Sequence, residues 1–322
     1  MPTRPSNATL GNTVITTTPI SLGLASLGRP GYLTLGHGDD FPDHSVEAMA
    51  ARTHEVLDAA YAAGVRHFDA ARSYGRAEEF LGRWLRDRSF EPASLTISSK
   101  WGYRYTADWQ VDADPPEVKE LTADNLRRQL AETREQLGDY LTLYQIHSAT
   151  RSSGVLDDPE IRRELDELRS HGVAVGLSTS GTEQGATILR AIEVGGYDTV
   201  QTTWNLLERS AGEALAAAHA AGLGVIVKEA LANGRLTARG DVNALHAAAQ
   251  RVGATEDALA LAAVLARPWV DTVLSGASTR DQLHSNLAAL DLAWDEPLER
   301  ELASLTEPAD EYWETRSALP WT

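Results

Sequence analysis

The chain repeats one local pattern: an alanine-rich helical stretch, a glycine, and then a short apolar run that ends in a polar residue. Copies occur at residues 59–69, 170–178, 195–201, 221–228 and 269–275. The glycines are typical of the left-handed residue that ends a helix just before the next strand. The pattern therefore predicts helices and strands that alternate along most of the chain.

The apolar runs are continuous rather than alternating, which is typical of parallel strands covered by helices. Eight runs are expected as strands, at about Ile20–Gly23, Arg66–Asp69, Leu95–Ser99, Leu141–Ile146, Val173–Ser178, Thr199–Gln201, Gly224–Val227 and Thr272–Leu274. No linker rich in proline, glycine or serine separates them. We therefore expect residues 1–322 to form one domain, a closed (β/α)8 TIM barrel.

A doubly wound sheet is the alternative fold. Its Gly-x-Gly-x-x-Gly fingerprint is missing after the first run, because the glycines of 23–28 have the wrong spacing.

Four segments are left over. Thr9–Thr18 places Gly11-Asn12 between β-prone residues and predicts a hairpin that closes the bottom of the barrel. Residues 31–43, the aromatic-rich loop 101–121 and a tail with three aromatic residues are expected at the carboxyl-terminal face. Long loops in a compact domain are usually functional. We expect the 101–121 loop to form a wall of the substrate pocket, with Trp101 and Tyr103 binding substrate.

The composition restricts the classes of function. With 43% hydrophobic and 23% charged residues, the chain is typical of a folded protein with a large core. Its formal net charge of −17 argues against binding to nucleic acid or to an anionic membrane. The chain has no cysteine, which excludes disulfides and thiolate chemistry. No apolar run is long enough to span a membrane, so a cytoplasmic protein is expected. For its oligomeric state, a monomer or a small homo-oligomer is expected.

Candidate chemistry lies at the ends of three predicted strands. Asp69 ends the second strand, Tyr74 follows on the same loop, and Lys100 and His147 follow the third and fourth strands. A barrel gathers these ends on one face. Each residue alone has a structural explanation, such as a helix cap for Asp69 or a buried core histidine for His147. Because a buried ammonium needs a partner, we expect Lys100 to pair with Asp69.

The four residues together suit proton transfer to a carbonyl. A free tyrosine has a pKa of about 10, and a nearby ammonium should lower that pKa and let Tyr74 act as acid or base. A neutral His147 could hydrogen-bond to the same substrate oxygen and fix its position.

Three segments carry a family resemblance: 67–75 (HFDAARSYG), Ser99-Lys100 and Tyr144–His147. They resemble the aldo-keto reductase superfamily, and the likeness runs from about Gly23 to Asn286. The resemblance implies a (β/α)8 barrel that uses NADP(H), or less often NAD(H), to reduce aldehydes, ketones or sugars. It implies a catalytic set of Asp69, Tyr74 as general acid/base, Lys100 and His147. No metal is implied.

The resemblance also implies the cofactor-binding residues. These are Gly23, Ser178, Thr179, Gln201, Lys228, Ala230, Leu231, Asn233, Gly234, Arg235, Gly276, Ser278, Gln282 and Asn286. Four positions depart from the family pattern. Thr179 replaces the usual asparagine, Lys228 replaces an aromatic residue that stacks on the nicotinamide, and Gly276 and Gln282 replace cations that bind the 2′-phosphate. Arg280 and helix N-terminal amides could substitute for those cations, so NADP(H) remains the expected cofactor.

Two other functions stay open at this point. Lys100 or Lys228 at a strand end could form a Schiff base, as in a barrel lyase. A cofactor-binding barrel could also serve as the redox-sensing partner of another protein. Retention of Tyr74 and His147 favours an enzyme that acts on a small carbonyl or alcohol.

Overall fold

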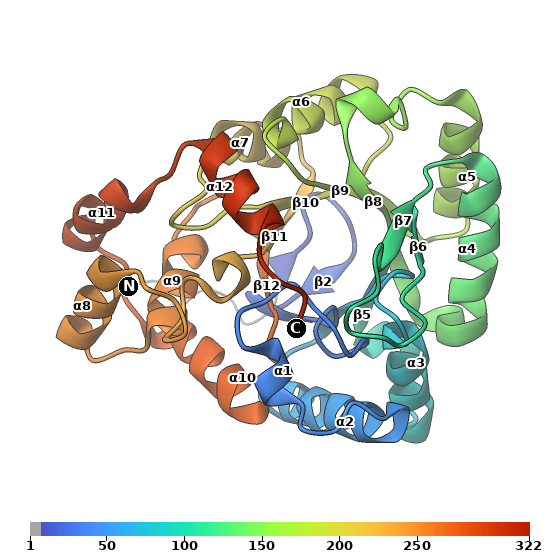
Figure 1. The fold of residues 1–322 in the computed structure, drawn as a ribbon. Coiled ribbons are helices and arrows are strands. Elements are labelled where there is room, and N and C mark those ends of the chain that lie inside the picture. Colours follow the sequence, from blue (N-terminus) through green and yellow to red (C-terminus); the bar gives the residue numbers. More distant parts are fainter. Residues whose placement is uncertain (1–7) are drawn as a thin grey trace.

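Eight parallel strands close into a barrel in the computed structural model, which describes residues 8–322 (Figure 1). The strands are β3 (Ile20–Gly23), β4 (His67–Asp69), β5 (Thr96–Trp101), β8 (Leu141–Ala149), β9 (Ala174–Thr179), β10 (Thr199–Thr203), β11 (Gly224–Lys228) and β12 (Thr272–Ser275). They follow one another around the barrel in sequence order, and β12 pairs with β3 through Val273 and Ile20. The predicted (β/α)8 barrel is confirmed.

Two strands run further than the apolar pattern predicts. Lys100 lies inside β5, where it is in register with Gln145, and His147 lies inside β8. A polar side chain that points into the barrel does not end a strand, because the backbone still pairs with both neighbouring strands. The carboxyl ends of β5 and β8 therefore carry their chemical groups on fixed backbone rather than on loops.

Helices surround the barrel and cover the outer face of its strands (Figure 1). The helices of the structure are α1 (His37–Asp40), α2 (Val46–Ala62), α3 (Ala77–Asp87), α4 (Ala123–Leu137), α5 (Pro159–Ser170), α6 (Gln184–Val194), α7 (Gly212–Ala220), α8 (Asn243–Val252), α9 (Glu256–Leu265), α10 (Arg280–Leu287), α11 (Glu296–Leu302) and α12 (Ala309–Ser317), of which α1 and α12 lie at the open end of the barrel. Gly64, Gly172 and Gly222 follow three of these helices with φ of +94°, +85° and +87°. They are the left-handed residues that the repeated pattern predicts.

The bottom of the barrel is closed by the predicted hairpin, formed by β1 (Ala8–Thr9) and β2 (Thr16–Thr17). Leu10 is fully buried at its turn and packs against Leu143 and Ile226 of the barrel. Gly11 has a φ of +52°, and a Cβ there would lie 2.4 Å from the Gly222 carbonyl oxygen. Only glycine fits so close to another backbone.

The predicted 101–121 loop contains a second small hairpin. Its strands are β6 (Tyr103–Tyr105) and β7 (Glu117–Lys119), which pair antiparallel beside the open end of the barrel (Figure 1). Among residues 8–322, no helix combines the length and the apolar character needed to cross a membrane.

Candidate active site

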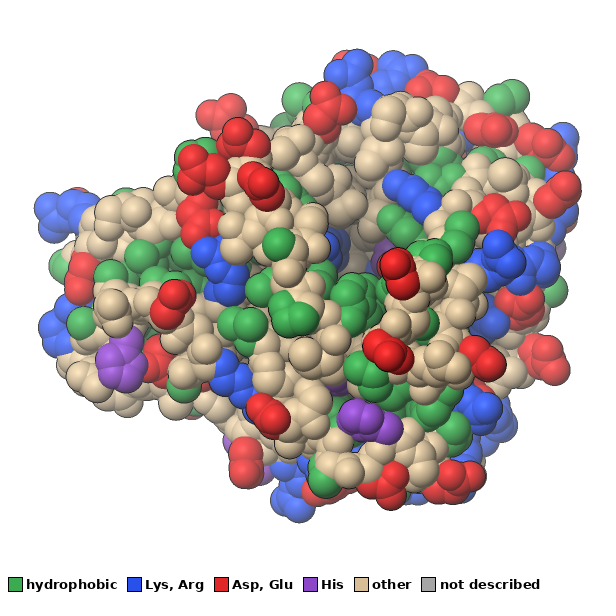
Figure 2. Space-filling model, in the orientation of Figure 1, with side chains coloured by type: hydrophobic (Ala, Val, Ile, Leu, Met, Phe, Trp, Pro, Cys, Tyr) green, Lys and Arg blue, Asp and Glu red, His purple; other side chains and the backbone are tan. Residues whose placement is uncertain are grey.

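A cavity of about 560 Å³ opens at the carboxyl ends of the strands. Figure 2 shows this face hollowed between α12 and the β6–β7 hairpin. All three regions expected at this face contribute to its wall, through Tyr32, Tyr103 and Trp321 among others. Catalytic groups of barrel enzymes gather at this face, where each strand delivers its last side chains to one space.

Asp69 and Lys100 form a buried ion pair at one end of this cavity. The Lys100 ammonium donates to the Asp69 carboxylate and to the Ala70 carbonyl oxygen, 3.0 Å away. Lys100 is fully buried and Asp69 is 1% exposed. The structure thus pairs these residues as the cost of burying an ammonium requires.

Tyr74 and His147 lie next to the ion pair. The two rings meet edge to face with centroids 5.4 Å apart, and the Lys100 Nζ atom lies 4.9 Å from the Tyr74 ring centroid. Tyr103 packs against the His147 ring at 5.0 Å. Asp69, Tyr74 and His147 all line the cavity. The four residues predicted from three separate strands therefore come together in one place.

Tyr74 keeps its proton in the free protein. Burial raises its pKa well above 10, and the negative charge of Asp69 raises it further, while Arg29 opposes both. The expectation that the pKa of Tyr74 is lowered is therefore wrong. The reason is that Asp69 lies beside the ammonium and offsets its positive charge, so the phenol is left with the cost of burying a phenolate.

His147 is neutral at physiological pH. Burial lowers its pKa well below 6.5, and the positive charges of Lys100 and Lys228 lower it further. The Ser73 hydroxyl lies 3.4 Å from Nδ1. If Ser73 donates to Nδ1, the proton of the ring is on Nε2, which can then donate to a ligand oxygen.

Further hydrogen bonds hold the Asp69 carboxylate inside the barrel. The Ser98 hydroxyl donates to Oδ1 at 2.6 Å, and the side-chain amides of Gln145 and Gln201 donate to the same oxygen at 3.3 Å. The His67 Nε2 atom lies 2.9 Å from the Ser98 oxygen. Nothing in the sequence marks Ser98, His67 or Gln145 as supports, because all three lie within apolar runs.

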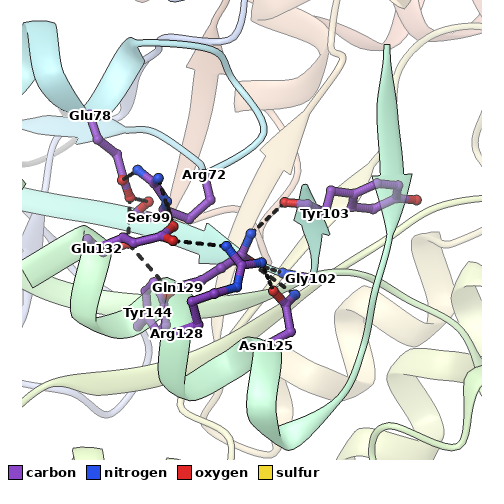
Figure 3. Close-up of polar contacts among 11 residues, drawn as sticks. Arg72, Glu78, Ser99, Gly102, Tyr103, Asn125, Arg128, Gln129, Glu132 and Tyr144 are labelled. Carbon is purple, nitrogen blue, oxygen red and sulfur yellow. Dashed lines mark hydrogen bonds and ion pairs between the residues drawn. The ribbon is translucent and has the colours of Figure 1, made fainter. Parts of the chain in front are cut away.

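A second buried carboxylate supports the loop that carries Tyr74 (Figure 3). Glu78 is 2% exposed and accepts hydrogen bonds from Arg72, Ser99 and Thr133, at 2.5, 2.5 and 2.8 Å. Arg72 lies two residues before Tyr74, and Ser99 directly precedes Lys100. Glu78 therefore ties the Tyr74 loop to the strand of Lys100. The sequence analysis missed this role.

The same close-up shows how Tyr103 is held. The Gln129 side chain accepts from the Gly102 backbone N–H at 2.8 Å and donates to the Tyr103 carbonyl oxygen at 2.8 Å (Figure 3). Trp101, by contrast, is fully buried in the core between strands and helices and does not line the cavity. Its predicted contact with substrate is wrong, because side chains alternate along β5 and Lys100 takes the inward position.

Most of the residues that the resemblance assigns to a cofactor line the cavity. They are Gly23, Gln201, Lys228, Ala230, Leu231, Asn233, Gly234, Gly276, Ser278, Gln282 and Asn286. Within the described part of the chain, the Gln201 Oε1 and Asn233 Oδ1 atoms are buried and have no hydrogen-bond partner. Such atoms on a cavity wall need a ligand or water to satisfy them.

Three of the assigned residues do not reach the cavity. Ser178 accepts the backbone N–H of Ser148 at 2.8 Å, and the Thr179 hydroxyl lies 2.9 Å from that of Thr202. Their neighbour Ser180 lines the cavity instead. Both side chains satisfy their hydroxyls within the strands, so their assignment to direct cofactor contact is corrected.

Arg235 is the third. Its guanidinium pairs with Glu307 at 3.0 Å and lies 5.8 Å from the Tyr312 ring centroid. In the preceding turn, Ala232–Gly234, the residues Asn233 and Gly234 line the cavity, whereas Arg235 points toward the region of α12. Arg235 therefore fastens the carboxyl-terminal region rather than contacting a cofactor.

Lys228, the unusual residue of the sequence analysis, is held by two partners. Its ammonium donates to the Thr203 hydroxyl at 2.8 Å and lies 3.4 Å from the Glu229 carboxylate. Glu229 in turn accepts two bonds from Arg316, at 2.9 and 2.6 Å. Two cations thus share one carboxylate on the cavity wall.

Arg29 is a wall residue that the sequence analysis did not identify. It is 3% exposed, pairs with Glu117 at 2.9 Å, and lies within 5.5 Å of the ring centroids of Tyr74 and Trp321. An arginine six residues after a strand gives no sequence signal of its own. Within residues 8–322, no cluster of histidine and carboxylate side chains is arranged to hold a metal ion.

We expect Glu78→Gln to lower the free energy of unfolding by about 2 kcal/mol, because Arg72 keeps Glu132 but loses its buried partner. Urea-induced unfolding measures the change. Glu79→Gln is the matched control, since its side chain is half exposed, and it should cost less than about 0.5 kcal/mol. Equal effects of the two substitutions would contradict the role given to Glu78.

Comparison with known proteins places the chain in a family. The model of the "Aldo/keto reductase family" matches residues 19–303. The chain is 34% identical to the aldo-keto reductase str7 of Strobilurus tenacellus, but over only 108 residues, which are 34% of this chain and 28% of that protein.

Other similarities extend over most of the chain. It is 26% identical over 282 residues to the uncharacterized oxidoreductase YrpG of Bacillus subtilis, covering 77% of this chain and 84% of YrpG. The fold matches that of the aldo-keto reductase AKR11C1 of Bacillus halodurans with a TM-score of 0.73 at 20% identity, covering 94% of this chain and 96% of that one. The chain therefore belongs to the aldo/keto reductase family of oxidoreductases.

Proposed function

We propose that the protein transfers a hydride between a nicotinamide dinucleotide, NADP(H) or NAD(H), and the carbon of a carbonyl or alcohol substrate. The substrate is an aldehyde, a ketone or a sugar, and Tyr74 is the general acid/base. The observation that carries this proposal is the meeting of Tyr74 and His147 over the buried Asp69–Lys100 pair, at one end of a cavity. Family membership supports the oxidoreductase class.

The cavity wall suits a dinucleotide. The buried, unpartnered oxygens of Gln201 and Asn233 can accept from amide or hydroxyl groups. The cofactor would be held by the wall residues near them, which include Gly23, Lys228, Ala230, Leu231, Gly234, Gly276, Ser278, Gln282 and Asn286. When bound, the nicotinamide ring supplies or accepts the hydride.

Tyr74 moves the proton. In the reduction direction, its hydroxyl gives a proton to the substrate oxygen as that oxygen gains negative charge. The raised pKa of Tyr74 keeps the acid form fully populated before the reaction. In the oxidation direction, the phenolate takes the proton from the alcohol. The Lys100 ammonium, 4.9 Å from the ring centroid, stabilises the phenolate.

His147 orients the substrate oxygen. As a neutral ring with its proton on Nε2, it donates a hydrogen bond to the oxygen that receives the proton from Tyr74. The T-shaped contacts with Tyr74 and Tyr103 fix the plane of the ring. The position of the reacting carbonyl is thereby set by two groups on rigid parts of the barrel.

A Schiff-base lyase that uses Lys100 is less consistent with this geometry. Lys100 is fully buried, lies off the cavity wall and is paired with Asp69. A lysine nucleophile needs a neutral amine that the substrate can reach. Because Lys100 is buried and paired with Asp69, it acts on the neighbouring side chains through its charge rather than as a nucleophile.

We expect Tyr74→Phe to lower kcat for carbonyl reduction by about 10³-fold, because the variant has no proton to donate at the substrate oxygen. The affinity for cofactor, measured by quenching of protein fluorescence, should change less than about threefold. Tyr32→Phe is the control, since this ring also lines the cavity but lies apart from the ion pair. A Tyr74→Phe variant with a tenth or more of the normal kcat would refute the assignment of the acid.

The pH dependence follows from the two pKa shifts. The His147 pKa is lowered by burial, so the ring stays neutral until the pH falls well below 6.5, and the Tyr74 pKa is raised by burial, so the phenol keeps its proton past pH 10. We expect kcat/KM for reduction to vary less than about twofold between pH 6.5 and 9. An inflection of kcat/KM between pH 6.5 and 7.5 would contradict this expectation, because it would show that the pKa of His147 is not lowered by burial.

A further inference from the structure

A carboxylate closes the end of the cavity that lies away from Tyr74. Asp40, the last residue of α1, accepts two hydrogen bonds from the Arg239 guanidinium, at 2.9 and 2.5 Å. It also accepts one from the Gln282 amide, at 2.8 Å. Its side chain is only 10% exposed. Asp40 thus joins the segment after β3 to the loop after β11 and to the first turn of α10.

The two partners of Asp40 are the groups that an added anion at this end would use. Arg239 and Gln282 both line the cavity. The side-chain Oε1 atom of Gln282 already accepts the Ser278 backbone N–H at 2.8 Å, and the side-chain Nε2 atom donates to Asp40. Asp40 therefore occupies two of the five N–H groups of Arg239 and one of the two amide N–H groups of Gln282, and a second anion would compete with it for these donors.

The charges around Asp40 and its partners Arg239 and Gln282 are unbalanced. Besides Asp40, the wall at this end carries Glu256, Asp257 and Asp281. Among residues 8–322, Arg239 is the one lysine or arginine on the wall there. Arg280 is off the wall and faces Glu55, 4.0 Å away. The end of the cavity is therefore strongly acidic.

This acidity distinguishes the two dinucleotides. A phosphate monoester carries about −1.5 to −2 charges at pH 7, so a 2′-phosphate would meet an excess of carboxylates. A ribose hydroxyl is neutral and can donate a hydrogen bond to a carboxylate oxygen. Gln282 is also the position at which the family resemblance leads one to expect a phosphate-binding cation, and here Asp40 bonds directly to it.

We propose that Asp40 is a specificity-determining residue that makes the cavity select NAD(H) over NADP(H), by occupying Arg239 and Gln282 with its own carboxylate. The proposal rests on the function proposed above, because it assumes that the cavity holds a dinucleotide. It reverses the cofactor preference that the resemblance alone implies.

The test is the dissociation constant of the full chain for NAD⁺ and for NADP⁺, measured by isothermal titration calorimetry without substrate. The wild type should bind NAD⁺ at least tenfold more tightly than NADP⁺. Asp40→Asn should tighten NADP⁺ binding at least tenfold and change NAD⁺ binding less than threefold. Asp39→Asn is the matched control, since it removes the same charge from an exposed neighbour and should change the ratio less than twofold.

The double variant Asp40→Asn, Arg239→Met shows whether the tighter binding of NADP⁺ by Asp40→Asn depends on Arg239. If the gain comes from releasing Arg239, the second substitution should remove most of it. Tighter binding of NADP⁺ than of NAD⁺ by the wild type would overturn the proposal for Asp40 and leave the oxidoreductase function intact. Equal gains for both dinucleotides in Asp40→Asn would also overturn it. If the wild type binds neither dinucleotide, the proposed function fails together with it.

Discussion

The active site depends on one constraint: a lysine ammonium is placed in the interior of a barrel, where an unpaired charge is too costly to keep. Asp69 meets this constraint directly, because its carboxylate faces Lys100 from the neighbouring strand. An ion pair buried this deeply still leaves carboxylate lone pairs to satisfy. Ser98, Gln145 and Gln201 supply those donors from three strands. The buried ion pair therefore requires hydrogen-bond donors on the strands around Asp69.

The same pair explains why Tyr74 is an acid in the free protein. An isolated ammonium beside the phenol would lower its pKa, but the adjacent carboxylate offsets that effect, and burial then dominates. Tyr74 thus keeps its proton in the free protein. Glu78 gives this arrangement a second anchor, since it holds Arg72 on the Tyr74 loop and Ser99 beside Lys100. Two buried carboxylates, one on each face of β5, set the distance between the acid and its cation.

The sequence predicted the barrel, the floor hairpin and the four residues that meet at the site, because each depends on a local pattern or on the rule that strand ends share one face. It was wrong where the outcome depends on where a strand ends. Had β5 ended at Ser99, Trp101 could have lain on a loop beside the substrate, but the strand continues and alternation turns its ring into the core. Arg235 and Asp40 could not be assigned either, since their partners, Glu307 and Arg239, are 72 and 199 residues away.

Charge along the cavity then gives the site a direction. Lys228 lies close enough to His147 for its charge to lower the pKa of that ring. It shares the single carboxylate of Glu229 with Arg316, which leaves an excess of positive charge there in a chain whose net charge is −17. The wall also carries four carboxylates, Asp40, Glu256, Asp257 and Asp281, and Arg239 pairs with the first of them. A ligand that brings anionic groups near Lys228 and neutral hydroxyls near Asp40 matches this gradient, whereas a ligand with an added anion near Asp40 opposes it.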